Sequence, residues 1–272
     1  MPTLRKSSVT ETRSVTETPS LILGDCREVM RRMGVGTVDA VVTDPPFGIA
    51  YTAGSGSGKR IWGKMESKGA IVGDDGVEGA LDWLPFAYAV LRDGGVMLVF
   101  TRWDVACAWR AAISNAGFDI VNEIIWDKNR PTQGDLLGSL GQAHETELLC
   151  AKGKWRVPGF RFSSVWRVPP TAGVGRIHPM EKPVSLMRLC LEAVTKEGDV
   201  VLDPFAGSGS TLVACREMGR VGVGIEVDPI WHAVAEKRLR EEPARVGLFP
   251  KVMDTKTKGR GVRLGDDVGD GV

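Results

Sequence analysis

The chain has 272 residues, and its 35 Lys and Arg against 34 Asp and Glu give a formal net charge of +1. This length suits one α/β domain with insertions, and the near balance of charge argues against a general basic coat for nucleic acid, so any basic surface must be local. The five cysteines stand singly, without a Cys-x-x-Cys pair, which favours a reduced cytoplasmic protein and no bound metal. Residues 1–20 are polar and unlike a signal peptide, and no apolar run has the length of a membrane span, so no membrane segment is expected.

Short apolar runs alternate with helical patterns along the chain. The runs are rich in β-branched residues and apolar on both faces, as buried parallel strands are. Strands are predicted at 21–25, 38–44, 95–101, 119–126, 200–203 and 222–227. Helices are predicted to begin after Asp104, at Pro183, near Thr211, and at Asp228 with Pro229. This alternation predicts a doubly wound, mostly parallel α/β sheet.

Some segments fall outside the alternation, and they define the expected domain organisation. One main domain is predicted at 21–241, with a loop at about 50–70 and a second insertion at about 128–177. Residues 1–20 form a polar tail. Residues 242–272 are rich in Gly, Lys and Asp, so a loosely ordered tail is expected there.

A glycine-rich segment, VVLDPFAGSGST at 200–211, follows a predicted strand and opens a helix. Gly207 and Gly209 stand where a tight turn lets a ligand approach the backbone. Glu226 ends the next strand, where an acid can accept hydrogen bonds from ribose hydroxyls. A Gly-x-Gly alone also fits a plain turn, and no Gly-Lys-Ser/Thr follows to hold a triphosphate. Strand, helix and acid together favour a nucleoside ligand without phosphates.

A second segment, VVTDPPFG at 41–48, ends a strand with an acid and two prolines. Ligands of open parallel sheets bind beyond the carboxyl ends of the strands, so Asp44 is expected on the same edge as Glu226. The prolines stop the strand and leave the Pro45 carbonyl free to accept a hydrogen bond. Asp-Pro-Pro can merely end a strand. Beside a nucleoside site, however, Asp44 and Pro45 suit an amino group with two hydrogens, and the Phe47 ring suits a planar base.

These two segments, with HPMEKP at 178–183 between them, resemble the AdoMet-dependent DNA amino-methyltransferases of the beta group, in which the catalytic motif precedes the cofactor motif. The resemblance spans about 20–241 and includes IIWDKNR at 124–130 and HETELLCAKG at 144–153. It implies a Rossmann-like AdoMet methyltransferase fold with a circularly permuted motif order. Asp25 and Glu226 are then expected on adjacent strand ends although they are far apart in sequence.

The resemblance also assigns the site. The catalytic residues it implies are Asp44, Pro45, Pro46 and Phe47. S-adenosyl-L-methionine is expected to contact Asp25, Cys26, His178, Pro179, Lys182, Asp203, Phe205, Gly207, Ser208, Gly209, Ser210, Thr211 and Glu226. Within that set the resemblance puts Asp25 at the adenine ring, Glu226 at the ribose and the 178–183 motif at the methionine moiety.

The implied function is site-specific methylation of the exocyclic 6-amino group of adenine in duplex DNA, after the base is flipped out. Cytosine-N4 methylation is the alternative, since those enzymes more often carry Ser at the position of Asp44. Protein glutamine methyltransferases usually show Asn-Pro-Pro, no RNA module is recognisable, and a non-catalytic nucleotide-binding module does not need Asp44. No Pro-Cys pair occurs, which argues against covalent ring-carbon methylation. Nothing resembles a nuclease, so the enzyme is either an orphan or has a separate restriction partner.

The resemblance makes 128–177 a target-recognition segment. DNA contacts are expected from basic residues in this segment and in the loop at about 50–70. They are Lys59, Arg60, Lys64, Lys128, Arg130, Lys154, Arg156, Arg161 and Arg167. Interleaved aromatics, among them Phe160 and Trp166, suit base stacking, although a solvated loop with aromatics in the core is the alternative. The loop at 50–70 either closes over the flipped base or has no role. Because few residues remain to read double-stranded DNA, a homodimer is expected.

Overall fold

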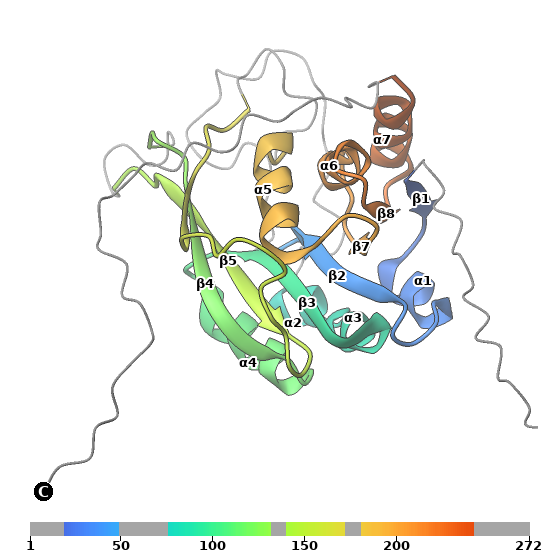
Figure 1. Ribbon diagram of the computed structural model, residues 1–272, viewed down its shortest axis with the longest axis horizontal. Coiled ribbons are helices and arrows are strands. Elements are labelled where there is room, and N and C mark those ends of the chain that lie inside the picture. The colour runs from blue at the N-terminus through green and yellow to red at the C-terminus, as the bar shows by residue number, and fades with distance from the viewer. Residues whose placement is uncertain (1–18, 49–75, 132–139, 172–180, 242–272) are drawn as a thin grey trace, which may run out of the picture.

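The computed structural model describes residues 19–48, 76–131, 140–171 and 181–241. They form a sheet of eight strands in the order β1-β8-β7-β2-β3-β5-β4-β6, with helices on both faces (Figure 1). The strands are β1 (Ser20–Leu23), β2 (Val38–Thr43), β3 (Leu91–Thr101), β4 (Asp119–Asp127), β5 (His144–Ala151), β6 (Val165–Arg167), β7 (Val200–Asp203) and β8 (Val221–Glu226). The helices are α1 (Cys26–Arg32), α2 (Val77–Leu81), α3 (Leu84–Val90), α4 (Ala106–Asn115), α5 (Val184–Val194), α6 (Ser210–Glu217) and α7 (Pro229–Glu241).

Strand direction determines where the site lies. β5 is antiparallel to both of its neighbours, β3 and β4, and every other pair in this sheet is parallel. The carboxyl ends of the parallel strands therefore meet at one edge of the sheet, which we call the rim, and the amino end of β5 lies at the same edge. The mostly parallel, doubly wound sheet predicted from the sequence is confirmed.

The permuted strand order is also confirmed. The first strand, β1, pairs in parallel with the last, β8, and Leu23 stands opposite Glu226. The backbone N–H of Gly24 donates to the carbonyl of Glu226 at 2.9 Å. Asp25 and Glu226 thus lie on adjacent strand ends at the rim. β7 and β2, which carry the glycine-rich and Asp-Pro-Pro segments, are neighbours as well.

Apolar side chains of the sheet form a core on each face because successive residues of a strand point to opposite sides. On one face Val42 and Phe100 pack with α5 and α6, and on the other Val41 and Val99 pack with α1, α3 and α4. Figure 1 shows α5, α6 and α7 on one side of the sheet and α1 to α4 on the other. No helix in the described ranges is both long and apolar enough to cross a membrane.

Two sequence predictions need correction. Residues 128–177 were expected outside the sheet, but β5 and β6 belong to this segment and β5 lies between β3 and β4. Its acids Glu145 and Glu147 interrupt the apolar pattern that marks a buried strand, and for that reason β5 was missed. Asp104 does not cap α4, because its carboxylate pairs with Arg102 at 2.8 Å and the helix begins at Ala106. The predicted tails, 1–20 and 242–272, and the loop at 50–70 lie almost wholly outside the described residues.

Candidate active site

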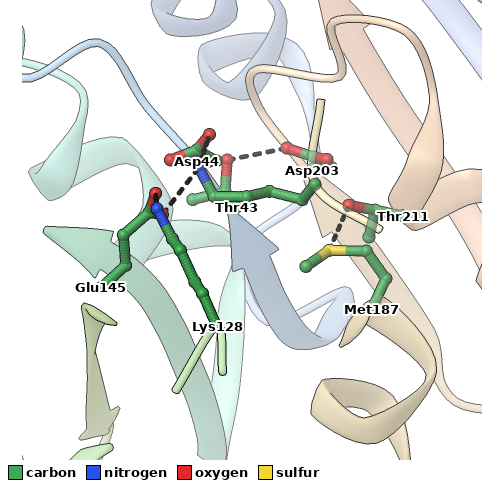
Figure 2. A network of polar contacts seen from close by, with 8 residues as sticks. Thr43, Asp44, Lys128, Glu145, Met187, Asp203 and Thr211 are labelled. Carbon is green, nitrogen blue, oxygen red and sulfur yellow. Dashed lines mark hydrogen bonds and ion pairs between the residues drawn. The ribbon is translucent and has the colours of Figure 1, made fainter. Parts of the chain in front are cut away.

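The end of β2 is tied to the end of β7 at the rim. The hydroxyl of Thr43 donates to Oδ1 of Asp203 at 2.7 Å in a buried contact. The register of the two strands, with Val41 opposite Leu202, brings these side chains together. This bond fixes the start of the Asp44-Pro45 segment against the glycine-rich segment, and Figure 2 shows Thr43 between Asp44 and Asp203.

One carboxylate oxygen of Asp44 accepts a hydrogen bond, and the other has no partner among the described residues. The ammonium of Lys182, just ahead of α5, donates to Oδ2 at 2.5 Å. Oδ1 is buried and has no hydrogen-bond partner among the described residues. A buried acceptor without a donor is costly, and in functional sites it marks the place where a ligand donates. Oδ1 is therefore the best candidate in the site for accepting a hydrogen bond from substrate.

Two further charged residues extend the Asp44–Lys182 pair. Glu145, at the amino end of β5, places Oε2 at 3.2 Å from the Lys182 ammonium, and its Oε1 accepts from Lys128 at 2.5 Å. Lys182 lies over the ring of Phe100, and Lys128 lies over the ring of Trp126. Figure 2 shows Glu145 of β5 and Lys128, just after β4, reaching toward Asp44. We call Asp44, Lys182, Glu145 and Lys128 the rim network.

The pKa values in the rim network reflect burial opposed by pairing. Burial raises the pKa of Asp44, and the Lys182 ammonium works against that rise. Burial also acts to raise the pKa of Glu145, but Lys182 and Lys128 outweigh it and hold that pKa below its usual value. The pKa of Lys182 is raised, because the carboxylates of Asp44 and Glu145 overcome the effect of burial. Lys182 is therefore a permanent cation beside the predicted catalytic residue Asp44.

Glu147 lies below the rim network on the same face of β5 and is fully buried. Its Oε2 accepts a weak hydrogen bond from the thiol of Cys190 at 3.6 Å, and its Oε1 has no partner in the described part of the chain. Burial raises the pKa of Glu147 to about 8, despite opposing effects of Cys190 and Lys182. A pKa of about 8 favours the protonated form at neutral pH, which leaves the Lys182 ammonium to the carboxyl groups of Asp44 and Glu145.

The glycine-rich segment forms a tight turn before α6. Gly207 and Gly209 have φ values of 51° and 81°, in the left-handed region that favours glycine. A Cβ on Gly209 would also lie 3.2 Å from the Cβ of Ala235. Asp203 accepts from the backbone N–H of Phe205 at 3.1 Å and holds the start of the turn. Burial raises the pKa of Asp203 to about 6, against hydrogen bonds from Thr211 and Thr43.

Glu226 joins the turn from the end of β8. Its Oε2 accepts from the backbone N–H of Gly207 at 2.7 Å, and its Oε1 accepts from that of Asp228 at 2.9 Å. Burial raises the pKa of Glu226, and these backbone donors oppose the rise. Each carboxylate oxygen has a second lone pair, so both can still accept from the hydroxyls of a ribose.

A cavity of about 110 Å³ opens beside Glu226. Its lining includes the predicted cofactor residues Asp25, Cys26, Phe205 and Glu226, together with Pro46 from the catalytic segment. The mixture of acids, an aromatic ring and backbone at a tight turn fits the adenosine part of AdoMet. Asp25 caps α1 by accepting from the backbone N–H of Arg27 at 2.8 Å, and its carboxylate also pairs with the Arg27 guanidinium.

Sequence reasoning missed part of this lining. Gly79, Ala80 and Trp83, at and just after α2, border the cavity, and nothing in their sequence marks them as ligand contacts. Trp83 is nearly fully buried and stacks edge-on against Phe205, with ring centroids 5.3 Å apart. Trp83 thereby fixes the orientation of the Phe205 ring, which lines the cavity.

Other predicted cofactor residues lie close by or outside the described ranges. Ser208, Ser210 and Thr211 are buried at the start of α6, where the Thr211 hydroxyl contacts the sulfur of Met187 at 3.4 Å (Figure 2). His178 and Pro179 lie outside the described residues. The structure brings Lys182 to the carboxylate of Asp44, and its contact with cofactor stays a prediction.

The predicted catalytic segment carries an aromatic ring, Phe47, three residues after Asp44. Phe47 is half-buried and touches both cores, and its ring lies edge-on to Trp109 with centroids 6.3 Å apart. Pro45 is buried and Pro46 is half-buried, which leaves this segment little freedom. The described residues hold no cluster of His, Cys, Asp and Glu side chains suited to a metal ion.

The predicted DNA contacts divide into two groups. The Lys128 side chain is only 12% exposed and its ammonium binds Glu145, so its contact with phosphate stays a prediction that competes with this ion pair. The other described members are exposed, namely Arg130, Lys154, Arg156, Arg161 and Arg167. Trp166 is buried in the core and cannot stack on bases, whereas Phe160 is 68% exposed. Lys59, Arg60 and Lys64 lie outside the described residues.

Comparison with known proteins identifies the family. Residues 38–237 match the DNA methylase family N6_N4_Mtase, and the chain belongs to this family. The Escherichia coli (strain K12) protein YubD is 33% identical over 224 residues, which cover 80% of this chain and 88% of YubD. Type II methyltransferase M.HinfI of Haemophilus influenzae is 28% identical over 261 residues, which cover 82% of this chain and 68% of M.HinfI.

Solved structures agree on the fold. The M1.HpyAVI–SAM complex matches with a TM-score of 0.62 at 23% identity, over 81% of this chain and 98% of that one. PvuII DNA methyltransferase, which is cytosine-N4-specific, matches with a TM-score of 0.64 at 16% identity, over 85% of this chain and 88% of that one. The Rossmann-like AdoMet methyltransferase fold is therefore confirmed. The protein is an AdoMet-dependent DNA methyltransferase of the beta group, and its substrate is DNA.

Replacement of Glu226 by Ala should weaken AdoMet binding at least about tenfold, because two hydrogen bonds to a charged acceptor each contribute roughly 1.5 to 3 kcal/mol. Isothermal titration calorimetry measures the dissociation constant. Glu236→Ala, on the exposed side of α7, is the matched control and should bind as wild type does. An unchanged dissociation constant for folded Glu226→Ala would remove Glu226 from the cofactor site.

Replacement of Glu147 by Gln should make folding stability less dependent on pH. An acid whose pKa is raised by folding, here from 4.5 to about 8, stays protonated in the folded state while the unfolded chain loses its proton. Stability therefore falls as pH rises from 4.5 toward 8, and Gln removes this loss.

Urea unfolding at pH 5 and pH 8 tests this. Relative to wild type, Glu147→Gln should gain at least about 1 kcal/mol more at pH 8 than at pH 5, since one pKa unit corresponds to about 1.4 kcal/mol. Glu123→Gln, an exposed change on β4, controls for the loss of one carboxylate. An equal effect of Glu147→Gln at both pH values would contradict a protonated Glu147.

Proposed function

We propose that this DNA methyltransferase transfers the methyl group of S-adenosyl-L-methionine to the 6-amino group of adenine in duplex DNA. The observation that carries the proposal is the state of Asp44, whose Oδ2 is held by Lys182 and whose buried Oδ1 has no partner among the described residues. A carboxylate held in this way can accept one hydrogen bond from a substrate amine. The Pro45 carbonyl supplies a second acceptor one residue later.

An exocyclic amino nitrogen is a weak nucleophile because its lone pair is delocalised into the base. Hydrogen bonds from its two N–H groups to Asp44 and to the Pro45 carbonyl favour localisation of that pair on nitrogen. The nitrogen can then attack an electrophilic methyl group in line, without a covalent bond to the enzyme. Asp44 is also placed to take the proton that the methylated amine loses.

AdoMet supplies the methyl group on a positively charged sulfur, and the residues beside the cavity fit its adenosine part. Glu226 would hold the ribose, Asp25 and Phe205 would hold the adenine ring, and the turn at Gly207 would let the cofactor approach the backbone. Pro46 also lines the cavity, which supports a cofactor position next to the proposed catalytic segment. Cofactor and target amine are thus expected to meet at the ends of β7 and β2.

The target base must leave the duplex to reach Asp44, which costs a few kcal/mol of unstacking. The half-buried Phe47 ring, three residues after Asp44 in the chain, is proposed as the surface on which the flipped base stacks. Exposed basic residues at Arg156, Arg161 and Arg167 are proposed to hold the phosphates around it.

Cytosine-N4 methylation is the second candidate, and the fold shared with the cytosine-N4-specific PvuII enzyme supports keeping it. Asp rather than Ser at position 44 favours adenine. Methylation of plasmid DNA from a methylation-deficient host, followed by nucleoside mass spectrometry, decides between them. N6-methyladenine is the expected product, and N4-methylcytosine would replace the adenine proposal by the alternative.

Replacement of Asp44 by Ala should lower kcat by at least about 100-fold, because the amine loses a preorganised acceptor in a buried site. AdoMet affinity should stay within about threefold, since the carboxylate acts on the amine and not chiefly on the cofactor. Transfer of a radiolabelled methyl group and calorimetry measure the two quantities. Asp93→Ala, on an exposed part of β3, is the control. Loss of cofactor affinity in folded Asp44→Ala would contradict this role.

We also propose that the working unit is a homodimer. Two strands of the 128–177 segment, β5 and β6, belong to the sheet, which reduces the surface available for a specific DNA interface, and such an interface usually buries on the order of 1,000 to 2,500 Å² of protein. A second subunit could supply contacts for the target base of the first.

Light scattering with and without duplex DNA should therefore show a dimer. Mixing Asp44→Ala with a variant in which Arg156, Arg161 and Arg167 are all Ala should restore activity, if one subunit contacts DNA for the other. A monomer at micromolar concentration on DNA, with no activity restored in the mixture, would contradict the dimer.

A further inference from the structure

We infer that Glu145 is a positioning residue for methyl transfer: it holds the ammonium of Lys182 on Oδ2 of Asp44, and Lys128 holds Glu145 in turn. The inference rests on the proposed function because Asp44 must accept the target amine. Neither Glu145 nor Lys128 belongs to the Asp-Pro-Pro or glycine-rich segment. They come from β5 and the end of β4, the strands that lie beyond β3 from the catalytic segment.

The position of the Lys182 ammonium is set by three contacts. It lies 2.5 Å from Oδ2 of Asp44, 3.2 Å from Oε2 of Glu145, and 4.8 Å from the centre of the Phe100 ring. An ammonium group between two carboxylates is drawn toward both. Without the charge of Glu145 it is free to move toward Asp44 and bridge both of its oxygens. Oδ1 would then be occupied, and the target amine would lose its acceptor.

Glu145 is itself held at both oxygens. Oε2 faces Lys182, and Oε1 accepts from Lys128 at 2.5 Å. Lys128 is fixed in turn by its backbone N–H, which donates to the Ala143 carbonyl at 2.9 Å, and by the Trp126 ring under its ammonium. Pairing of β4 with β5 thus sets the distance between Lys128 and Glu145 before any substrate is bound.

Burial argues against direct phosphate binding by the side chains of the rim network. The exposed fractions are 7% for Lys182, 12% for Lys128 and 24% for Glu145, so none of them forms part of an open phosphate-binding surface. Surface ion pairs contribute little, but a buried charge that loses its partner is costly. The rim network therefore couples β4 and β5 to the catalytic acid.

The charges of the rim network are balanced, and this balance sets the basicity of the Asp44 carboxylate. Lys182 and Lys128 oppose the carboxylates of Asp44 and Glu145, Glu147 below them is protonated, and Asp203 lies on the far side of Thr43. Neutralising Glu145 removes a negative charge that faces Asp44 and leaves two cations near one carboxylate. Asp44 then becomes a weaker base and a more strongly paired acceptor.

The test is Glu145→Gln in the full-length protein, with unmethylated plasmid DNA from a methylation-deficient host as substrate. Incorporation of radiolabelled methyl groups counts transfer to any base, so the result does not depend on whether adenine is the target. We expect kcat to fall at least about tenfold, since misplacing a catalytic group by about 1 Å can cost 100-fold in rate. AdoMet affinity and KM for DNA should stay within about twofold of wild type, because neither ligand contacts Glu145.

The pH profile and a conservative variant separate positioning from damage to the fold. The acid limb of kcat should move to lower pH in Glu145→Gln, because a negative charge facing Asp44 is gone. Glu145→Asp restores the charge with a shorter side chain and should recover part of the rate. Glu123→Gln, an exposed change on the neighbouring strand β4, should match wild type.

Lys128→Met separates the network from DNA binding. A phosphate contact would show as weaker DNA binding and a smaller salt dependence, whereas a network role lowers kcat and leaves DNA affinity unchanged. We expect the second result, with a smaller loss of kcat than in Glu145→Gln.

Wild-type kcat in Glu145→Gln, or an acid limb that stays or moves up, would overturn the inference. So would loss of cofactor affinity in proportion to kcat. Methylation of cytosine by the wild type would overturn the adenine proposal alone, because all of these comparisons would still be valid.

Discussion

The proposed chemistry depends on one constraint, which is that a largely buried carboxylate, that of Asp44, must be kept ionised at the rim of the sheet. Burial raises the pKa of Asp44, and an uncharged acid would be a poor acceptor for an amine. Lys182 opposes that rise from 2.5 Å away and occupies only Oδ2. The remaining oxygen, Oδ1, is the acceptor that the proposed chemistry requires. Such a pair needs support on every side, because a misplaced ammonium would either release Asp44 to protonation or cover both oxygens.

The reversed strand β5 supplies that support. In a sheet of parallel strands only carboxyl ends reach the rim, and those positions already carry Asp44, Asp203 and Glu226. Because β5 runs antiparallel between β3 and β4, its amino end brings Glu145 to the rim on the same face as Lys182. Circular permutation has a similar effect on the cofactor side, since pairing β1 with β8 brings Asp25 next to Glu226. The chain thereby assembles two parts of one site from five strands.

Much of the fold and of the cofactor side of the site was predictable because short sequence patterns determine it. The buried strands β2, β3 and β7, the turn at Gly207 and Gly209, and an acid at the end of β8 each leave a sequence signature and lie as expected, whereas β1 and β4, predicted in the same way, are only partly buried. The rim network was not predicted, because its members depend on which strands pair. The sequence alone predicts Lys128 as a surface cation, whereas the pairing of β4 with β5 directs its ammonium to Glu145. The two acids in HETELLCA interrupt the apolar pattern of β5, so the strand was not predicted. A buried acid in an apolar strand is nevertheless a signal of a functional role.

The most direct test of the account is a crystal structure of the protein with duplex DNA and an AdoMet analogue that cannot transfer a methyl group. The account predicts that the amino group of the flipped base donates to Oδ1 of Asp44 and to the Pro45 carbonyl. Lys182 should remain on Oδ2 and on Glu145. An amino group bound elsewhere, or a Lys182 ammonium that bridges both oxygens of Asp44 in the assembled complex, would contradict it.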